Sequence, residues 1–549
     1  MFLRKRILLL GITALLFISA CGKKEESNSK DHIAKVLNTF LLGEPKTLDP
    51  SISTDTYSGD ILINIFEGLT RIAPDAYGED KITGAGALSW ESSSDKTIWT
   101  FHLRDHKWED GKKVTAQDYV YGIRRSLDPA TASPYSYLLF PIKNAEGFNR
   151  GELSKEELGV RAVDESTLEI TLEKKTPYFL ELTYSSLMLP EREDIVEEYG
   201  DTYGSGADKL VANGPFKVRS WDHEQKIVLE KNPTYWDNTS VGLDTISFYI
   251  TRDENARMSM LFKGEAQIGE ASKKEWAEKF SSSDDFYEYP GYSAATNYLF
   301  FNENNKLFTN KNIRKAFSLG IKREEMSEMV YRGLFEAAYG WVAPGIHMEG
   351  RDFRKKVGDV LPKDSSSKAK YYLLKGLEEL GMSSTKPEDI TVTYLNPSTS
   401  NWARTYSEYL AKMYKETLGV NVRSEFLSWP VFEKRVAERE YDFGGMAWYA
   451  DYNDPSSFLE IFSGQSEVSP VNWDTEEYDE LLSRAFHSEE AGERLDSFAE
   501  AEKLLLDRGW ITPTVYIKRR IFISRDVKGY YLTPFTSPDY KNVYIEKNN

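Results

Sequence analysis

The chain has 549 residues, too many for one compact core, so its length predicts two or three domains. Apolar residues make up 40% of it and aromatic residues 13%, as is typical of a well-folded globular protein. The net charge of −18 argues against nucleic acid as a partner, because that partner requires a basic surface.

The N-terminus has the pattern of a targeting segment. A short basic stretch precedes an apolar run at 7–20, which is too short to span a membrane comfortably. The run ends in Ile-Ser-Ala before Cys21, which resembles the lipobox of bacterial lipoproteins. Cleavage before Cys21 and acylation of its sulfur would anchor the mature chain to the membrane. The alternative is a secretory signal followed by a stray cysteine; with no other cysteine present, no disulfide is expected.

The segment after Cys21 is charged and serine-rich and has no apolar periodicity. This composition predicts a disordered tether over 21–32. An apolar run of strand length follows at 36–42 and leads into the sequence Glu-Pro-Lys-Thr-Leu-Asp-Pro, which starts at Glu44.

Helices and strands then alternate with clear local signals. Apolar residues at 61–69 have helical spacing, and 98–103 alternates like a strand. Thr115 followed three residues later by Asp118 predicts a capped helix start. Two strand-like runs within 216–231 predict a hairpin.

The second half of the chain has the same mixture of elements. An alternating aromatic strand is expected over 287–302, and a further strand is expected over 514–523, near the end of the sequence. Between them, helices and strands alternate over 369–426, which predicts a mainly parallel sheet.

The most informative stretch runs from Tyr441 to Phe462. An apolar aromatic run at 443–449 is followed by Asp451, by turn-forming residues at 452–455, and by helical spacing after them. A carboxylate at the end of a buried strand costs free energy unless it is paired. An ammonium group arriving with a ligand would be such a partner. The alternative is that Asp454 or Asp451 only caps the following helix.

Several of these stretches together resemble one protein family. The sequence WYADYNDPSSFLEIF resembles a Trp-x-Ala-Asp-Tyr-x-(Asp/Glu)-Pro-x-x-Phe-Leu segment of oligopeptide-binding proteins, the extracytoplasmic receptors of peptide ABC importers. The Glu-Pro-x-x-Leu-Asp-Pro loop and Phe-Glu-Gly-Leu at 66–69 also match that family. Trp-x-Asp-Gly-x-x-Val-Thr-Ala-x-Asp at 108–118 is similar to a signature of the wider family 5, or cluster C, of solute receptors.

The resemblance implies roles for particular residues. Asp451 would hold the α-amino group of a peptide, and Trp448 would help to form a side-chain pocket. Glu44 matches an acid near the ligand site. Further candidates for the ligand groove are Tyr135, Tyr298, Trp429, Tyr449 and Tyr452. For Tyr135, a tyrosine in an ordinary surface loop is the alternative.

The family's fold is α/β and periplasmic-binding-protein-like, with two lobes joined by a hinge and three domains with mixed sheets. By resemblance, domain I would be assembled from three segments, and its neighbours are inserted between them. The expected divisions are domain I at 33–57, 190–296 and 514–549, domain II at 58–189 and domain III at 297–513.

The resemblance predicts a monomeric receptor on the outer face of the cell membrane, lipid-anchored through Cys21. It would bind oligopeptides between two lobes and deliver them to the permease subunits of an ABC importer. Alternatives within the fold are a dedicated ligand, such as a peptide pheromone, dipeptide, nickel chelate or heme. An adhesin or signalling lipoprotein without a transport role is an alternative of another class.

Motifs for catalysis do not stand out in the chain. It has no Gly-x-Ser-x-Gly elbow, no phosphate-binding loop and no His-Glu-x-x-His. His102 and His106 are four residues apart, but zinc would require two more ligands. We therefore expect no enzyme activity, no bound metal and no cofactor, although a hydrolase whose carboxylates meet only in the fold stays open.

Overall fold

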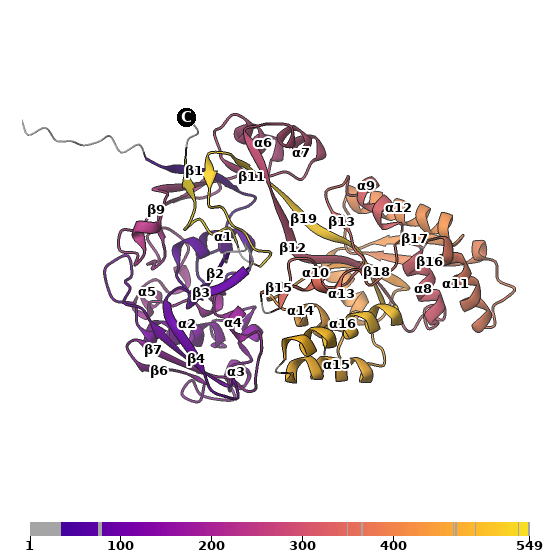
Figure 1. Ribbon diagram of the computed structural model, residues 1–549, viewed down its shortest axis with the longest axis horizontal. Helices are drawn as coiled ribbons and strands as arrows, with labels where there is room; N and C mark the ends of the chain where they lie inside the picture. Colours follow the sequence, from indigo (N-terminus) through magenta and orange to yellow (C-terminus); the bar gives the residue numbers. More distant parts are fainter. Residues whose placement is uncertain are drawn as a thin grey trace, which may run out of the picture. The chain divides into compact units, whose positions relative to one another are not determined.

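The computed structural model describes residues 34–546 apart from 75–79, 349, 364–365, 465, 467–468, 489 and 536. The predicted targeting segment, the tether and Cys21 therefore lie outside the described residues. The described residues from 35 onward form one compact unit, shown as a ribbon in Figure 1.

A four-stranded mixed sheet includes the first strand of the described chain. Strand β1 (Val36–Leu41) pairs in parallel with β10 (Thr245–Ile250), which pairs antiparallel with β9 (Lys226–Lys231). Strand β8 (Phe216–Asp222) completes the sheet and forms the predicted hairpin with β9. This hairpin prediction is confirmed.

A second four-stranded sheet has the order β4 (Ala87–Ser92), β5 (Ile98–Leu103), β7 (Thr167–Thr171) and β6 (Val160–Asp164). Helix α2 (Ala116–Leu127) packs against its strands β6 and β7. The predicted helix start is confirmed, because the backbone N–H of Thr115 donates to Asp118 Oδ2 at 2.7 Å. Helix α2 also passes close to another segment, since a Cβ on Gly122 would lie 2.2 Å from the Leu189 carbonyl oxygen.

We therefore expect Gly122→Ala to lower the free energy of unfolding by about 1–3 kcal/mol, the usual effect of overpacking. Gly492→Ala is a matched control, because a Cβ at Gly492 in helix α16 (Ala491–Arg508) meets no atom within 4 Å. Urea denaturation of both variants checks the prediction. Equal stability of the two variants would contradict it.

The largest sheet has the strand order β11 (Ile268–Glu270), β19 (Ile511–Ser524), β12 (Phe286–Phe301), β18, β16 and β17, with β13 (Glu336–Ala337) paired to β19. Strand β16 (Thr391–Asn396) is parallel to β17 (Asn421–Phe426) and to β18 (Phe443–Tyr449), and the other pairs are antiparallel. The sheet is therefore mixed, and the prediction of a mainly parallel sheet holds only for its β18-β16-β17 side.

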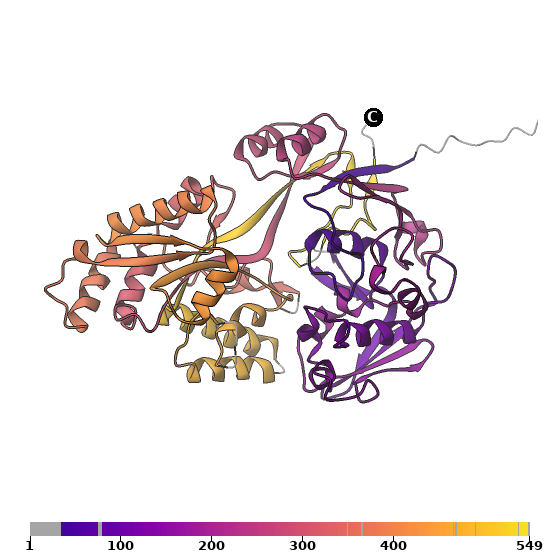
Figure 2. The ribbon, with the colours of Figure 1, turned by 180° about the vertical axis from the view of Figure 1, so that it is seen from behind.

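Strands β12 (Phe286–Phe301) and β19 (Ile511–Ser524) connect the core regions. They pair antiparallel over most of their length and lie side by side in Figure 1 and Figure 2. At one end, Ile523 belongs to a core built mainly from residues 37–268 and 521–543, and Tyr287 packs against that core. At the other end, Tyr298 and Leu299 belong to two cores built from residues 294–516.

Both faces of the large sheet are covered at that second end. Leu299 and Phe301 of β12 point into one core with helices α8 (Lys311–Leu319), α11 (Ser366–Glu379) and α12 (Asn401–Thr417). Tyr298 and Phe300 point into the other core, which includes α16. The fold is thus mixed α/β, as expected, whereas the division into three domains stays a prediction.

The remaining helices of four or more residues are α1 (Thr56–Ile65), α3 (Ala145–Asn149), α4 (Phe179–Leu182), α5 (Glu193–Tyr199), α6 (Glu254–Phe262), α7 (Lys274–Ser281), α9 (Arg323–Met329), α10 (Phe353–Val357), α13 (Trp429–Ala437), α14 (Ser456–Leu459), α15 (Glu476–His487) and the 3-10 helix η1 (Ser136–Leu139). The remaining strands are β2 (Thr70–Pro74), β3 (Asp80–Gly84), β14 (His347–Met348), β15 (Arg351–Asp352), β20 (Val527–Lys528) and β21 (Tyr544–Ile545).

Candidate functional site

The turn after β18 contains two acids, Asp451 and Asp454, and the sequence left open which of them bonds to the start of the next helix. Asp454 Oδ1 accepts from the backbone N–H of Ser456 at 3.0 Å, in the first turn of helix α14, whose N-cap residue is Pro455, so Asp454 is the acid that bonds to the helix start. Arg494 Nη2 donates to the other oxygen of Asp454 at 2.6 Å, and both side chains are buried. Asp451 is held only through its backbone, whose N–H donates to Ser457 Oγ at 2.7 Å.

The Asp451 carboxylate has neither an ion pair nor a hydrogen bond with any residue that the structure describes. Its side chain reaches solvent, yet the protein atoms around it raise its pKa to about 6 by burial. A carboxylate in such a place favours a cationic partner, because the partner would stabilise its charged form.

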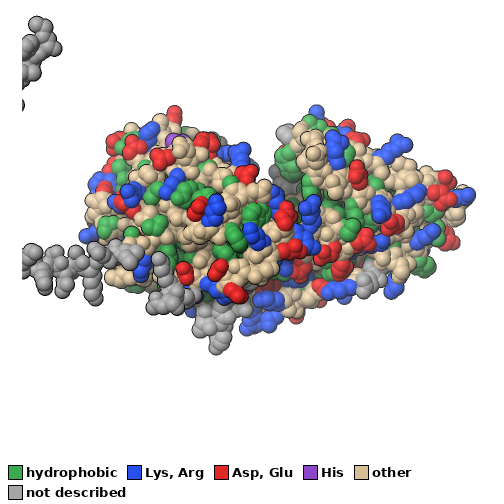
Figure 3. All heavy atoms as spheres, turned by 90° about the horizontal axis from the view of Figure 1, so that it is seen from above, with side chains coloured by type: hydrophobic (Ala, Val, Ile, Leu, Met, Phe, Trp, Pro, Cys, Tyr) green, Lys and Arg blue, Asp and Glu red, His purple; other side chains and the backbone are tan. Residues whose placement is uncertain are grey.

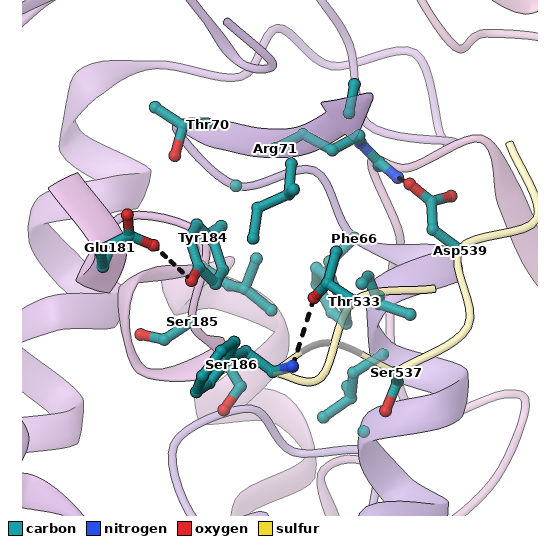
Figure 4. A pocket seen from close by; sticks show the side chains of 18 of the residues that line it. Phe66, Thr70, Arg71, Glu181, Tyr184, Ser185, Ser186, Thr533, Ser537 and Asp539 are labelled. Carbon is teal, nitrogen blue, oxygen red and sulfur yellow. Dashed lines mark hydrogen bonds and ion pairs between the residues drawn. The ribbon is translucent and has the colours of Figure 1, made fainter. Parts of the chain in front are cut away.

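Three adjoining cavities lie along this turn. The first, of about 280 Å³, is lined by Asp451 and Tyr452, and its wall is shown in Figure 4. The second, of about 400 Å³, shares the lining residues Phe535 and Ser537 with the first. The third, of about 900 Å³, shares Tyr449 with the second. Together they extend from Asp451 to helices α9 and α12.

An ion pair separates the second and third cavities. Arg519 Nη2 donates to Glu270 Oε2 at 2.9 Å, and both residues line both cavities. Tyr449, which is 58% exposed, lies at the same boundary. On the face of the molecule seen in Figure 3, acidic and basic side chains are interspersed.

The other aromatic candidates from the same segment differ in exposure. Trp448 is partly buried and its Nε1 donates to the Ser457 carbonyl at 2.8 Å. Tyr452 is only 8% exposed; its ring stacks on Tyr178 at 4.0 Å and its hydroxyl donates to Glu460 at 2.8 Å. Tyr452 therefore contributes to the wall of the first cavity as a fixed side chain.

Two candidates, Tyr298 and Glu44, already have partners within the protein, and the role of Glu44 stays a prediction. Tyr298 is 2% exposed, packs on Trp341 at 4.6 Å and lines none of the three cavities, which corrects the expectation that it faces a groove. The Glu44 carboxylate already accepts hydrogen bonds from Trp221 Nε1 at 2.9 Å and from the backbone N–H of Glu224, and contacts His223 Nδ1. These bonds hold the segment that contains Glu44 against residues 221–224.

Tyr135 and Trp429 are exposed, and their roles stay predictions. The Tyr135 ring lies 6.2 Å from that of Tyr137. Burial and the nearby charge of Asp451 raise the pKa of Tyr137 to about 12, although Tyr137 lines none of the three cavities. Trp429 begins helix α13, stacks on Phe432 and lines none of the three cavities.

The sequence also did not indicate several polar residues of the first cavity. Tyr184 donates to Glu181 Oε2 at 2.7 Å, and Arg71 pairs with Asp539 from the far end of the chain. These residues belong to separate segments without a shared motif, so only the folded chain brings them together.

The structure shows neither a metal site nor a membrane helix in the part of the chain that it describes. Across the described ranges within 34–546, no three His, Cys, Asp or Glu side chains are grouped so that they could hold a metal ion. Nor is any helix within those ranges long and apolar enough to cross a membrane.

Comparisons with known proteins agree on one family. Residues 81–470 match the model of bacterial extracellular solute-binding proteins, family 5. The chain is 32% identical to the dipeptide-binding protein DppE of Bacillus subtilis over 96% of this chain and 94% of that protein. It is 31% identical to the oligopeptide-binding protein OppA of the same organism over 99% of both.

Solved structures agree with these matches. The Listeria monocytogenes OppA bound to peptide is 30% identical, with a TM-score of 0.70 over 94% of this chain and all of the other. The murein tripeptide-binding protein MppA in an unliganded open form is 27% identical, with a TM-score of 0.78 over 94% and 98%.

Proposed function

Because the chain belongs to the family 5 bacterial extracellular solute-binding proteins, we propose that it is a receptor that binds oligopeptides and delivers them to an ABC-type permease. The support is the family, the names of its relatives and the cavities beside Asp451. The predicted permease subunits and the monomeric state are part of this proposal.

The observation that carries the proposal is the unpaired carboxylate of Asp451 at the wall of the first cavity. In the part of the chain that the structure describes, Asp451 has no cationic partner, while Asp454 has Arg494. A peptide's α-ammonium group would supply the missing charge through a charge-assisted hydrogen bond. The adjoining cavities would hold the rest of the peptide, with water bridging side chains that fit loosely.

Native mass spectrometry of purified residues 22–549 tests this proposal. We expect a spread of co-purifying masses of a few residues each, lost on denaturation. One discrete mass would instead favour a dedicated ligand. A protein that stays empty when offered a peptide mixture would contradict peptide binding.

The lipid anchor at Cys21 is a second part of the proposal, supported by the lipobox-like sequence before it. We expect Cys21→Ala to abolish incorporation of labelled palmitate and to release the receptor from the cell membrane. Labelling of cells that express either form checks this. Label retained by Cys21→Ala would contradict acylation at that sulfur.

Peptide affinity should depend on pH. Burial raises the pKa of Asp451 to about 6, so protonation below that pH removes the charge that pairs with the ammonium group. Between pH 5 and pH 7 the peptide's α-ammonium group stays mostly protonated, so affinity at pH 5 should be about tenfold weaker than at pH 7. Calorimetry across this range checks the prediction, and Asp451→Asn should show a nearly flat profile. Affinity that rises on acidification would contradict it.

A further inference from the structure

The first cavity is large and has a defined wall. Its volume of about 280 Å³ is roughly twenty times the 10–15 Å³ that one water requires. Its lining comes mainly from helix α1, strand β2, helix α4 and the C-terminal part of the chain, together with Leu138 of η1 and the turn at Asp451. Figure 4 shows this wall from close by.

Most of that wall is apolar, and one part of it is polar. Leu62, Phe66, Ile72, Leu138 and Leu182 contribute hydrocarbon surface. The polar part consists of the hydrogen-bonded pair of glutamate and tyrosine at 181 and 184, and of a serine at 185, as labelled in Figure 4. The hydroxyl oxygen of that serine is buried and has no hydrogen-bond partner among the described residues.

The cavity offers little net charge to a ligand. Arg71 is neutralised by Asp539 and by Glu67, whose oxygen lies 2.7 Å from Arg71 Nη2. Burial raises the pKa of Glu181 to about 8, so this carboxyl group is mostly protonated at pH 7. An acidic ligand group would therefore find no free cation on the wall among the described residues.

The position of Asp451 decides which part of a peptide can enter. Asp451 lines this same cavity, and in a peptide the α-ammonium group and the first side chain are attached to one Cα atom. An ammonium group bound at Asp451 thus leaves the first side chain within reach of the cavity, whereas later residues are carried away along the backbone by roughly 3.3 Å each.

On the premise of the proposed function, we propose that this cavity selects the first side chain of the peptide, favouring large uncharged side chains, above all Tyr and Phe, over small or charged ones. Leu138, Glu181 and Ser185 are then specificity-determining residues. An aromatic side chain would bury its ring against the apolar wall, and a tyrosine hydroxyl would reach the polar part.

Calorimetry with the peptides Xaa-Ala-Ala-Ala at pH 7 tests the inference, where Xaa is Tyr, Phe, Gly, Asp or Lys. Burial of a large side chain is worth about 1.5–3 kcal/mol, so Tyr and Phe should bind about tenfold to hundredfold more tightly than Gly. Asp and Lys should bind no better than Gly. Equal affinity for all five peptides, or tightest binding of Lys or Asp, would overturn the inference while leaving peptide binding intact. Failure of all five to bind would instead count against the proposed function.

Filling the cavity provides a second test. Leu138 is half-buried in the short helix η1, so Leu138→Trp should reduce the tight binding of the Tyr and Phe peptides to the level of Gly. Leu374→Trp is the matched control, because Leu374 in helix α11 is 48% exposed and lines none of the three cavities. It should leave the ratio of Phe to Gly affinity unchanged. A ratio lowered equally by both variants, or by neither, would overturn the assignment of this cavity, provided that thermal unfolding shows both to be folded.

Discussion

Asp451→Asn should weaken peptide binding roughly tenfold to hundredfold at pH 7, since a hydrogen bond to a charged group is worth about 1.5–3 kcal/mol. The amide keeps the size of the side chain and removes only its charge. Because the Asp451 carboxylate has no ion pair with the described residues, the substitution removes an interaction with the ligand and no interaction within the protein. Calorimetry with a tetrapeptide measures the change directly.

Two controls make the result for Asp451 decisive. Asp389→Asn changes an exposed acid that lines none of the three cavities, and its affinity should equal that of the wild type. Asp451→Asn itself should not lower the melting temperature, because burial already disfavours the charged carboxylate. Unchanged affinity in Asp451→Asn would remove the main support for an amine-bearing ligand at this position.

Glu502→Ala should lower the free energy of unfolding by about 3–5 kcal/mol, as expected when one partner of a buried ion pair is removed. Glu502 in helix α16 is fully buried and pairs with Arg354, whose side chain is 8% exposed. The same carboxylate accepts the backbone N–H groups of Trp341 at 2.6 Å and Val342 at 2.9 Å. The variant would therefore leave a buried cation and two buried donors without their acceptor.

Glu500→Ala, two residues earlier in the same helix, is the matched control for this second prediction. Glu500 pairs with Arg484, but the two side chains are 60% and 47% exposed. Such surface pairs contribute about 0–1 kcal/mol, so this variant should unfold almost like the wild type. Thermal and urea unfolding of both variants measure the difference. An equal decrease in the free energy of unfolding of the two variants would show that the buried ion pair stabilises the protein no more than the surface pair does.

Local chemistry predicted several features correctly. The spacing of Thr115 and Asp118 indicated a capped helix, and the runs around 216–231 indicated a hairpin, because both depend on neighbours in the chain. The segment 443–462 was predicted as a strand, a turn and a helix, which is confirmed by strand β18 and helix α14. Each of the two acids has one of the expected features, since Asp454 accepts a backbone N–H in the first turn of the helix and the Asp451 carboxylate has no partner among the described residues.

Other features depended on which face of an element the fold covers. The alternation over 287–302 indicated a strand, but alternation alone does not show which of the two faces of the strand is buried. The sheet places Asn297 at the third cavity and buries Tyr298 against Trp341, whereas we expected Tyr298 to face the groove. Similarly, Glu44 has hydrogen-bond partners from 221–224, far from it in sequence.

By itself, the sequence determined the mixed α/β character, the order of most elements and the acid that stands out at the end of β18. Those features follow from neighbours in the chain, through periodicity, capping and turn chemistry. Only the tertiary structure decided what surrounds that acid. Helix α1, strand β2, helix α4 and the C-terminal segment meet around the first cavity, and residues as far apart as Arg71 and Asp539 pair there. Such contacts depend on long-range packing, which no local pattern encodes.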